Sequence, residues 1–349
     1  MMWEPSAKSD DPIMIIGGGL AGSEAAYQLA KRGVRVKLYE MRPKKYPPAH
    51  RTSKLAELVC SNSLGSDMLS SPAGILKAEM RALDSLIIKC ADLHKVPAGW
   101  ALAVDREAFS EEVTSRISSI PLIEIVIEEV TRIEGGPAII ATGPLTSTAL
   151  TSSLKEMVGK GFLYFYDAVA PVVLRETINM DIAFYGSRYG HGEDYINCPL
   201  TEEEYQRFYE ALINAEVAAR HDFEEERFFE GCLPIEVIAK RGRDALRFGP
   251  MRPVGIKDPR TEKEPYAVVQ LRQDDKEGRL YNMVGFQTNL RWSEQDRVFR
   301  LIRGLEEVEF ARYGVMHRNI YVNAPTVLDA WLRLKGFKDV FMAGQIVGV

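Results

Sequence analysis

The sequence predicts an α/β fold in which a domain built on a parallel sheet is interrupted by a smaller α+β insertion. Residues 12–42 pass through the patterns of a strand, a glycine-rich turn, a helix and a second strand. Apolar runs that end in small residues recur at 138–145 and 340–349, as expected of buried parallel strands. From about residue 190 the sequence becomes charged and amphipathic. A chain of 349 residues is long enough for two such domains.

The first of these stretches carries the most specific pattern in the chain. Gly17, Gly19 and Gly22 follow an apolar strand with G-x-G-x-x-G spacing, and Glu40 closes the next strand 18 residues after Gly22. In this pattern Gly17 allows a tight turn, Gly19 lets the backbone approach a pyrophosphate, and Gly22 lets helix and strand pack closely. The helix N-terminus favours the diphosphate, and Glu40 can accept hydrogen bonds from ribose hydroxyls.

This unit predicts a Rossmann-type site for an adenine dinucleotide. The expected binding residues are Gly17, Gly18, Gly19, Leu20, Ala21, Gly22 and Glu40. The alternative is a glycine-rich turn that holds no ligand.

Composition bounds the remaining possibilities. The net charge of −5 argues against general electrostatic coating of nucleic acid, although a local basic face is compatible with it. The N-terminus has no apolar signal core, and no apolar run is long enough to span a bilayer. Four cysteines at wide, unpatterned spacings indicate a reducing cytoplasm, with neither a disulfide framework nor a metal site.

Several elements can be predicted after the glycine unit. Residues 41–54 hold five cations and no acid, which is typical of a solvated loop but also suits contact with phosphates. Ser71 and a following proline begin a helix that is expected to continue to Cys90, with Cys90 in the core. One apolar stripe is expected along it: Leu76, Met80, Leu83, Ile87 and Cys90. A second helix follows Asp105.

The later half of the chain predicts the insertion. A capping box formed by Thr201 and Glu204 opens a helix running toward Arg220, and paired strands are expected at 267–271 and 281–287. The segment 240–252 holds five cations and one acid and can bind RNA phosphates. The expected domain bounds are 12–190 and 320–349 for the first domain and 191–319 for the insertion.

Six stretches together resemble a known family, the flavin- and folate-dependent tRNA (uracil-5-)-methyltransferases of bacteria. They are spread over nearly the whole chain: 16–24 (IGGGLAGSE), 39–43 (YEMRP), 58–64 (LVCSNSL), 231–236 (GCLPIE), 312–319 (RYGVMHRN) and 343–345 (AGQ). The resemblance implies a glutathione-reductase-like domain that binds FAD, and an inserted domain that helps to hold folate and tRNA. Gly143, Gly344 and Gln345 are then expected at the cofactor.

The resemblance also implies a reaction. A one-carbon unit passes from methylenetetrahydrofolate to C5 of the T-loop uridine of tRNA, with NAD(P)H as the electron source. Cys60 and Cys232 are implied as the reactive cysteines, without a fixed division of roles. A thiolate that adds at C6 of uracil makes C5 nucleophilic, and cations such as Arg241 and Arg243 can favour that thiolate and bind RNA.

Alternatives remain open for individual residues. Cys232 can instead be a buried cysteine beside a proline turn, and the same holds for Cys60. Cys198, just before the capped helix, is interpreted as structural. His317, with Arg318 and Asn319, is expected to stack on the pterin or face the flavin, and the alternative is an exposed histidine without a role.

Family members continue beyond the Ala-Gly-Gln segment, whereas this sequence stops at Val349, so we expect a fragment or an incomplete flavin site. Three other functions compete with the main hypothesis. The same chemistry can act on a ribosomal RNA uridine, or the chain can be a generic FAD oxidoreductase with a small-molecule substrate. It can also be an inactive flavin-containing RNA-binding protein.

Overall fold

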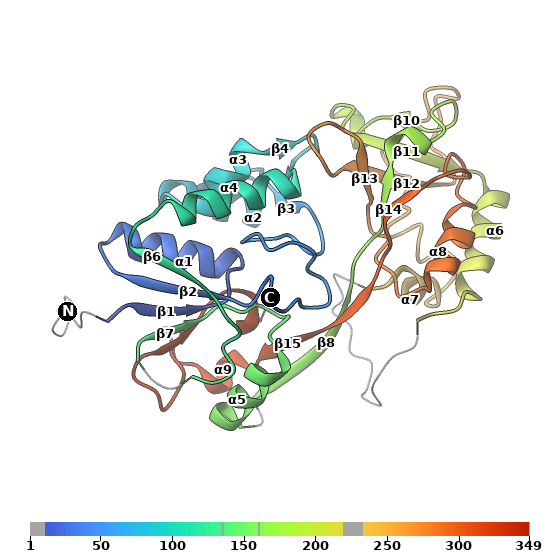
Figure 1. The fold of residues 1–349 in the computed structure, drawn as a ribbon. Helices are drawn as coiled ribbons and strands as arrows, with labels where there is room; N and C mark the ends of the chain where they lie inside the picture. Colours follow the sequence, from blue (N-terminus) through green and yellow to red (C-terminus); the bar gives the residue numbers. More distant parts are fainter. Residues whose placement is uncertain (1–10, 134–135, 160, 219–232, 349) are drawn as a thin grey trace.

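The computed structural model describes residues 11–133, 136–159, 161–218 and 233–348. Two lobes are visible in Figure 1, joined by a long ribbon of two strands. The ribbon consists of β8 (Phe162–Ala168) and β15 (Met316–Val322), which pair antiparallel along their whole length. Segments far apart in the sequence therefore leave and re-enter the first lobe side by side.

The first lobe is built on a five-stranded parallel sheet. Its order is β16 (Val340–Met342), β7 (Ala138–Ile140), β1 (Ile13–Ile16), β2 (Val36–Glu40) and β6 (Ile123–Ile127). Isoleucine, leucine and valine side chains are buried on both faces of this sheet, as the apolar runs predicted. The fold is the α/β, Rossmann-type fold expected from the sequence.

Helices cover both faces of this sheet (Figure 1). One face packs against α1 (Leu20–Lys31), α3 (Leu86–Leu93) and α4 (Arg106–Ser118). The other packs against α5 (Thr148–Val158) and α9 (Ala324–Val327). A small antiparallel sheet of β3 (Ser63–Ser66), β5 (Ala101–Val104) and β4 (Lys95–Val96) lies toward the second lobe.

The single helix expected from Ser71 to Cys90 is wrong, because the chain breaks into α2 (Pro72–Ala82) and α3. Ser71 caps α2 as predicted, accepting a hydrogen bond from the Gly74 amide. Asp84 then adopts φ 65°, a conformation that ends the helix, and Ser85 caps α3. Leu76 and Leu83 are 57% and 74% exposed, and the break separates them from the buried Ile87 and Cys90, so the predicted stripe is not continuous. Cys90 is fully buried, as predicted.

The second lobe is built on a six-stranded antiparallel sheet. Its order is β10 (Phe184–Tyr185), β11 (Tyr195–Leu200), β12 (Ala267–Gln273), β13 (Leu280–Met283), β9 (Val172–Leu174) and β14 (Phe310–Arg312). The helices α6 (Glu202–Ile213), α7 (Ile235–Ala239) and α8 (Trp292–Phe299) contribute to its core. The expected pairing of β12 with β13 is confirmed, but β13 ends at Met283, short of the predicted residue 287.

The capping box of α6 is confirmed, since the Thr201 hydroxyl and the Glu204 carboxylate each accept from the other's backbone amide. The helix ends at Ile213, however, short of Arg220. The domain boundary at 190/191 stays a prediction. Strands β9 and β10 precede that point and are nevertheless hydrogen-bonded into the six-stranded sheet.

Candidate active site

The glycine loop between β1 and α1 has the geometry of a diphosphate site. Gly17 has φ +104°, and a Cβ atom there would lie 2.7 Å from the Ala141 carbonyl oxygen. A Cβ atom on Gly22 would lie 1.8 Å from the Gly17 carbonyl oxygen, so both positions require glycine. A Cβ atom on Gly19 would meet nothing within 4 Å. The space above Gly19 is therefore open to a ligand at the N-terminus of α1.

A buried cluster of charges holds this loop from the side. The Glu40 carboxylate accepts hydrogen bonds from the Gly18 amide at 3.1 Å and from the Arg42 guanidinium at 2.9 and 3.0 Å. Arg42 is 2% exposed, and its guanidinium also donates to Glu57 at 2.8 Å. Burial acts to raise the pKa of Glu40, but the hydrogen bonds and charge of Arg42 outweigh it and lower the pKa. Glu40 is therefore a carboxylate that fixes the loop, and its predicted contact with a ribose stays a prediction.

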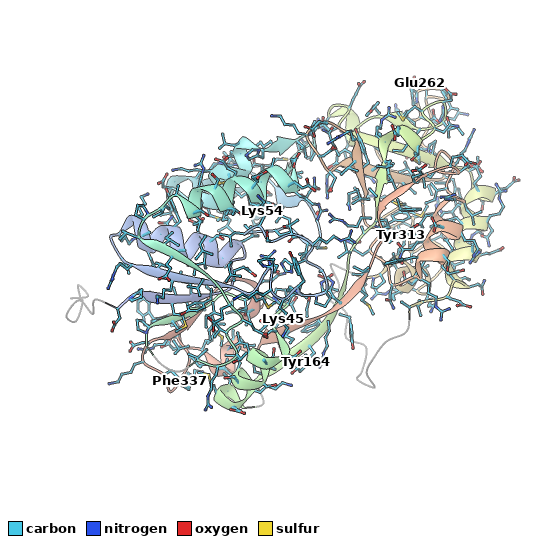
Figure 2. All side chains as sticks on the ribbon, viewed as in Figure 1. Lys45, Lys54, Tyr164, Glu262, Tyr313 and Phe337 are labelled. Carbon is cyan, nitrogen blue, oxygen red and sulfur yellow. The ribbon has the colours of Figure 1, made fainter. Side chains whose placement is uncertain are left out.

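This cluster corrects the interpretation of residues 41–54 as a purely solvated or phosphate-binding loop. Arg42 is its buried centre rather than a surface cation. Lys45 and Lys54, both labelled in Figure 2, do lie at the surface of the first lobe. They form ion pairs with Glu129 at 2.7 Å and with Glu111 at 2.8 Å.

Two adjoining pockets run along the carboxyl ends of the parallel strands. The smaller, of about 80 Å³, lies beside Glu40 and Arg42 and is the place expected for an adenosine and its phosphates. The larger, of about 460 Å³, lies beyond Gly19. Four residues line both pockets: Gly19, His50, Thr142 and Leu145. One elongated ligand can therefore occupy the two pockets together.

The larger pocket gathers most of the residues predicted to bind the cofactor. They come from the glycine loop and from the ends of β7 and β16: Gly19, Leu20, Ala21, Gly143, Gly344 and Gln345. Cys60, predicted as a reactive cysteine, lines the same pocket. Gly143 and Gly344 have φ +65° and +76°, so each allows its strand to turn sharply beside the pocket.

Cys60 lies in a segment, residues 58–62, that arginines from both lobes hold in place; we call it the Cys60 loop. Arg106, on α4, donates to the carbonyl oxygens of Leu58 at 2.8 Å and Cys60 at 3.3 Å. Arg272, on β12 of the second lobe, donates to Asn62 at 3.0 Å and to the Ser61 hydroxyl at 2.7 Å. The Cys60 thiol itself lies 3.8 Å from the Ala168 carbonyl oxygen.

The two arginines place the Cys60 loop at the junction of the lobes. Arg106 forms a buried ion pair with Asp274, which follows β12, at 3.0 Å. Both arginines are less than a tenth exposed. The position of Cys60 thus depends on how the two lobes meet. Cys60 is also only partly buried, which does not fit the alternative of a core cysteine.

Two histidines lie near the larger pocket. His50 lines it, and burial together with the charge of Arg42 lowers the pKa of His50 to about 4, so its ring is neutral. His317 lies on β15 and is 6% exposed, which excludes the alternative of an exposed histidine. Burial lowers the pKa of His317, against the opposing charge of Asp167 on β8. Within the described parts of the chain, the Nδ1 atoms of both histidines lack a hydrogen-bond partner.

Arg318 and Asn319, which follow His317 on β15, contact aromatic residues of β8 and β15. The Arg318 guanidinium lies over the ring of Tyr164 at 4.0 Å, a residue labelled in Figure 2. Asn319 is buried and donates to Tyr321 at 3.1 Å. None of these three residues is among the described residues that line the smaller or the larger pocket: His317, Arg318 and Asn319. Their predicted contacts with folate therefore stay predictions.

The other predicted site residues lie in the second lobe or outside the described residues. Cys232 falls within 219–232 and lies outside them. The chain that follows it is anchored by Glu236, which accepts hydrogen bonds from Thr288 at 2.9 Å and from the Asn289 amide at 2.8 Å. Arg241 and Arg243 are exposed on the turns after α7, and Arg243 pairs with Glu202 at 2.9 Å.

The remaining cysteines behave as the sequence indicated. Burial raises the pKa of Cys90 to about 11 and raises that of the fully buried Cys198 further above the ordinary value. Both are core residues. Over the residues that the structure describes, we find no cluster of three metal-ligating side chains. The helices of the same described ranges are all too short or too polar to cross a membrane.

Sequence reasoning gave no role to three residues that organise this site, His50, Arg106 and Arg272, and it included Asn62 only as part of the stretch 58–64. One signal was available for Arg272, which follows a run of apolar and amide residues within a buried strand. A cation there has to find a partner inside the fold. Nothing local marks Arg106, because its partners lie 46 to 168 residues away.

Comparisons with known proteins agree with this fold. The chain belongs to the family described as glucose inhibited division protein A, whose family model matches residues 12–349. It is 60% identical over 341 residues to a protein of Moorella thermoacetica named methylenetetrahydrofolate–tRNA-(uracil-5-)-methyltransferase TrmFO. It is 59% identical over 338 residues to the protein of that name from Bacillus subtilis. Each alignment covers 97% of this chain and 78% of the relative.

A solved structure supports the fold independently. The crystal structure of Aquifex aeolicus GidA (form II crystal) superimposes with a TM-score of 0.70 at 16% identity. The match covers 96% of this chain and 59% of that one. At this identity the likeness concerns the fold.

Proposed function

We propose that this protein methylates C5 of a uridine in tRNA, with methylenetetrahydrofolate as the one-carbon donor, FAD as bound cofactor and NAD(P)H as reductant. The observation that carries the proposal is the shared pocket: Cys60 lines the same cavity as the glycine loop, Gly143 and Gly344. The names of relatives about 60% identical over 97% of the chain supply the donor and the RNA. A cytoplasmic location belongs to the same proposal.

The residues present fit FAD. The open face of Gly19 can receive the pyrophosphate, Glu40 and Gly18 line the smaller pocket proposed for the adenosine end, and Gly143, Gly344 and Gln345 border the larger pocket proposed for the flavin end. His50 lines both pockets, and its buried Nδ1 atom has no hydrogen-bond partner among the described residues. When bound, FAD supplies the electrons that turn the transferred one-carbon unit into a methyl group.

The chain contributes thiol chemistry beside that cofactor. In the proposed reaction the Cys232 thiolate adds to C6 of uracil, the ring electrons move onto O4, and C5 attacks the electrophilic methylene. Loss of the C5 proton then expels the folate amine and leaves an exocyclic methylene on C5. Addition of a hydride to that methylene, for which bound FAD would supply the electrons, gives the methyl group as the thiolate leaves C6 and the C5–C6 double bond re-forms. Cys60, at the cofactor pocket, is proposed to act on the folate-derived carbon or to protect an intermediate. These two roles are assigned by resemblance and remain proposals.

The basic segment 240–252 is proposed to meet the RNA backbone. Lys240, Arg241 and Arg243 are exposed after α7, in a chain that is acidic overall. Cations on such a surface release counterions from phosphates, so binding should weaken steeply with salt.

The decisive experiment incubates the FAD-loaded protein with tRNA, methylenetetrahydrofolate and NADH and measures 5-methyluridine by nucleoside analysis. A parallel reaction with ribosomal RNA separates the two RNA substrates. We expect methylation of tRNA by the wild type and none by Cys232→Ala, although that variant should keep its flavin. Flavin reduction by NADH without methylation of either RNA would overturn the proposal in favour of a generic oxidoreductase.

A tRNA that carries 5-fluorouridine tests the nucleophile directly, because the fluorine at C5 cannot leave as a proton does. The trapped covalent adduct should form with the wild type and with Cys60→Ala, but not with Cys232→Ala. Adduct formation by Cys232→Ala and its loss in Cys60→Ala would show that the roles are reversed.

A further inference from the structure

A third pocket lies between the lobes, away from the glycine loop. It has a volume of about 370 Å³ and takes side chains from the β4–β5 turn, the segment before β11, and β12. The smaller and larger pockets beside the glycine loop are called the cofactor pockets below. Among the described residues, none lines both this pocket and either cofactor pocket. Six of its residues carry the argument: Ser66, Trp100, Arg188, Tyr189, His191 and Gln270.

Aromatic rings form its wall and stay accessible. The Trp100 and His191 rings lie 4.5 Å apart between centroids at an interplanar angle of 46°. Trp100 is 53% exposed and Tyr189 is 61% exposed, unusual values for large aromatic side chains. Together they offer flat faces to a planar ligand.

Hydrogen bonds hold this wall in place before any ligand arrives. The Gly99 amide, next to Trp100, donates to Asp194 at 2.7 Å, and Tyr195 donates to the Ala98 carbonyl at 3.0 Å. Tyr189 donates its backbone amide to the Gly255 carbonyl at 2.7 Å. A preformed wall loses little conformational entropy when it binds.

A cation completes the pocket. The Arg188 guanidinium donates to the backbone carbonyls of Val254 at 2.6 Å and Arg252 at 2.8 Å. These acceptors are neutral, so the bonds fix the guanidinium without cancelling its charge. Arg252 is also the last cation of the basic segment 240–252, so Arg188 is hydrogen-bonded directly to the segment proposed to meet RNA.

The pocket lies close to the Cys60 loop. Strand β3 leads from Ser63, which lines the larger cofactor pocket, to Ser66, which lines this one. Three residues of strand span about 10 Å. On β12, Gln270 lines this pocket while Arg272, on the same face of the strand, holds the Cys60 loop.

We propose that this pocket binds an unstacked base of the RNA substrate close to the target uridine. Trp100, Tyr189 and His191 stack against the base, and Arg188 meets an adjoining phosphate. Bases in single-stranded loops are recognised by stacking on aromatic side chains, whereas a paired helix hides its faces. Continuity with the basic segment favours RNA over a free dinucleotide. The inference rests on the proposed function, because it takes tRNA as the substrate.

The test measures tRNA affinity at fixed salt with the FAD-loaded full chain. Trp100→Ala and Tyr189→Ala should each weaken binding roughly tenfold, the effect expected when one stacked base is no longer supported. The slope of log affinity against log salt should not change, because neither side chain carries a charge that meets a phosphate. Trp100→Phe should restore most of the affinity. Trp331→Ala serves as the matched control, since Trp331 is 78% exposed and lies outside the pocket.

The outcomes separate this inference from the proposed function. Unchanged tRNA affinity in the Trp100→Ala, Tyr189→Ala double variant, with wild-type methylation intact, would overturn the pocket and leave the function standing. A raised KM for NADPH with unchanged tRNA affinity would assign the pocket to the dinucleotide instead. Failure of the wild type itself to bind and methylate tRNA would overturn both. Equal flavin content in all variants excludes misfolding as the cause.

Discussion

Replacing Arg42 by methionine should destabilise the first lobe by removing the centre of its buried charge cluster. The Arg42 side chain donates four hydrogen bonds, two to Glu40, one to Glu57 and one to the Thr52 carbonyl. Methionine fills a similar volume but leaves two carboxylates without their cation. Breaking a buried pair by removing one partner costs about 3–5 kcal/mol, because the remaining charge stays buried.

The destabilisation should depend on pH in a defined direction. In the wild type Arg42 keeps the pKa of Glu40 below its ordinary value in spite of burial. This carboxylate therefore stabilises the fold above the unfolded pKa of about 4.3, and the contribution disappears as the pH falls through the folded pKa. Without Arg42, burial raises the pKa of Glu40 above the unfolded value. The deficit of the variant should then be largest at neutral pH and shrink on acidification.

Urea unfolding of wild type and Arg42→Met at pH 7 and at pH 4.5 measures both effects. Lys45→Met is the matched control, because it also removes a cation from the segment 41–54. The Lys45 side chain is 49% exposed and forms an ion pair with Glu129. The control should cost about 1 kcal/mol or less. A deficit for Arg42→Met below that of the control, or an equal deficit at both pH values, would refute the reasoning.

Four further predictions concern flavin binding, the Cys60 loop, the core and the RNA surface. Gly19→Val should fold with unchanged stability but purify without yellow flavin absorbance, because its side chain meets only the ligand space. Arg272→Met should keep its flavin, but its methylation rate should fall roughly 100-fold because the Cys60 loop shifts. Arg279→Met is the control and should keep the wild-type rate, since the Arg279 side chain is exposed. Leu83→Ala should change the free energy of unfolding by less than about 0.5 kcal/mol because Leu83 is exposed, whereas Phe109→Ala should cost about 3–5 kcal/mol because Phe109 is fully buried. Urea titrations measure both, and a large effect of Leu83→Ala would contradict the exposure of Leu83. Reversal of Arg241 and Arg243 to glutamate should weaken tRNA binding and lower the salt slope by about one for each phosphate that is no longer bound. Arg297→Glu, a reversal on α8 in the same lobe, should leave the affinity unchanged, and equal behaviour of the two variants would place the RNA surface elsewhere.

The sequence by itself determined the features of this protein that depend only on residues close together in the sequence. The glycine loop was predictable because the requirement at Gly17 and Gly22 is steric and acts across a single strand–turn–helix unit. The capping box at Thr201 and Glu204 was predictable for the same reason, since both partners lie within one helical turn. Buried parallel strands were predictable from uninterrupted apolar runs.

Only the tertiary structure decided what the charged residues do. Arg42 looked like one of five loop cations, and its burial depends on Glu57, which folds back over it. Arg272 reaches Asn62 across 210 residues of sequence, and Asp84 ends a helix whose apolar spacing continues past it. A local pattern records that a residue is charged or apolar, whereas solvation and pairing depend on atoms brought near by the rest of the chain. For that reason the cofactor loop could be predicted from the sequence, and the arginines that hold Cys60 could not.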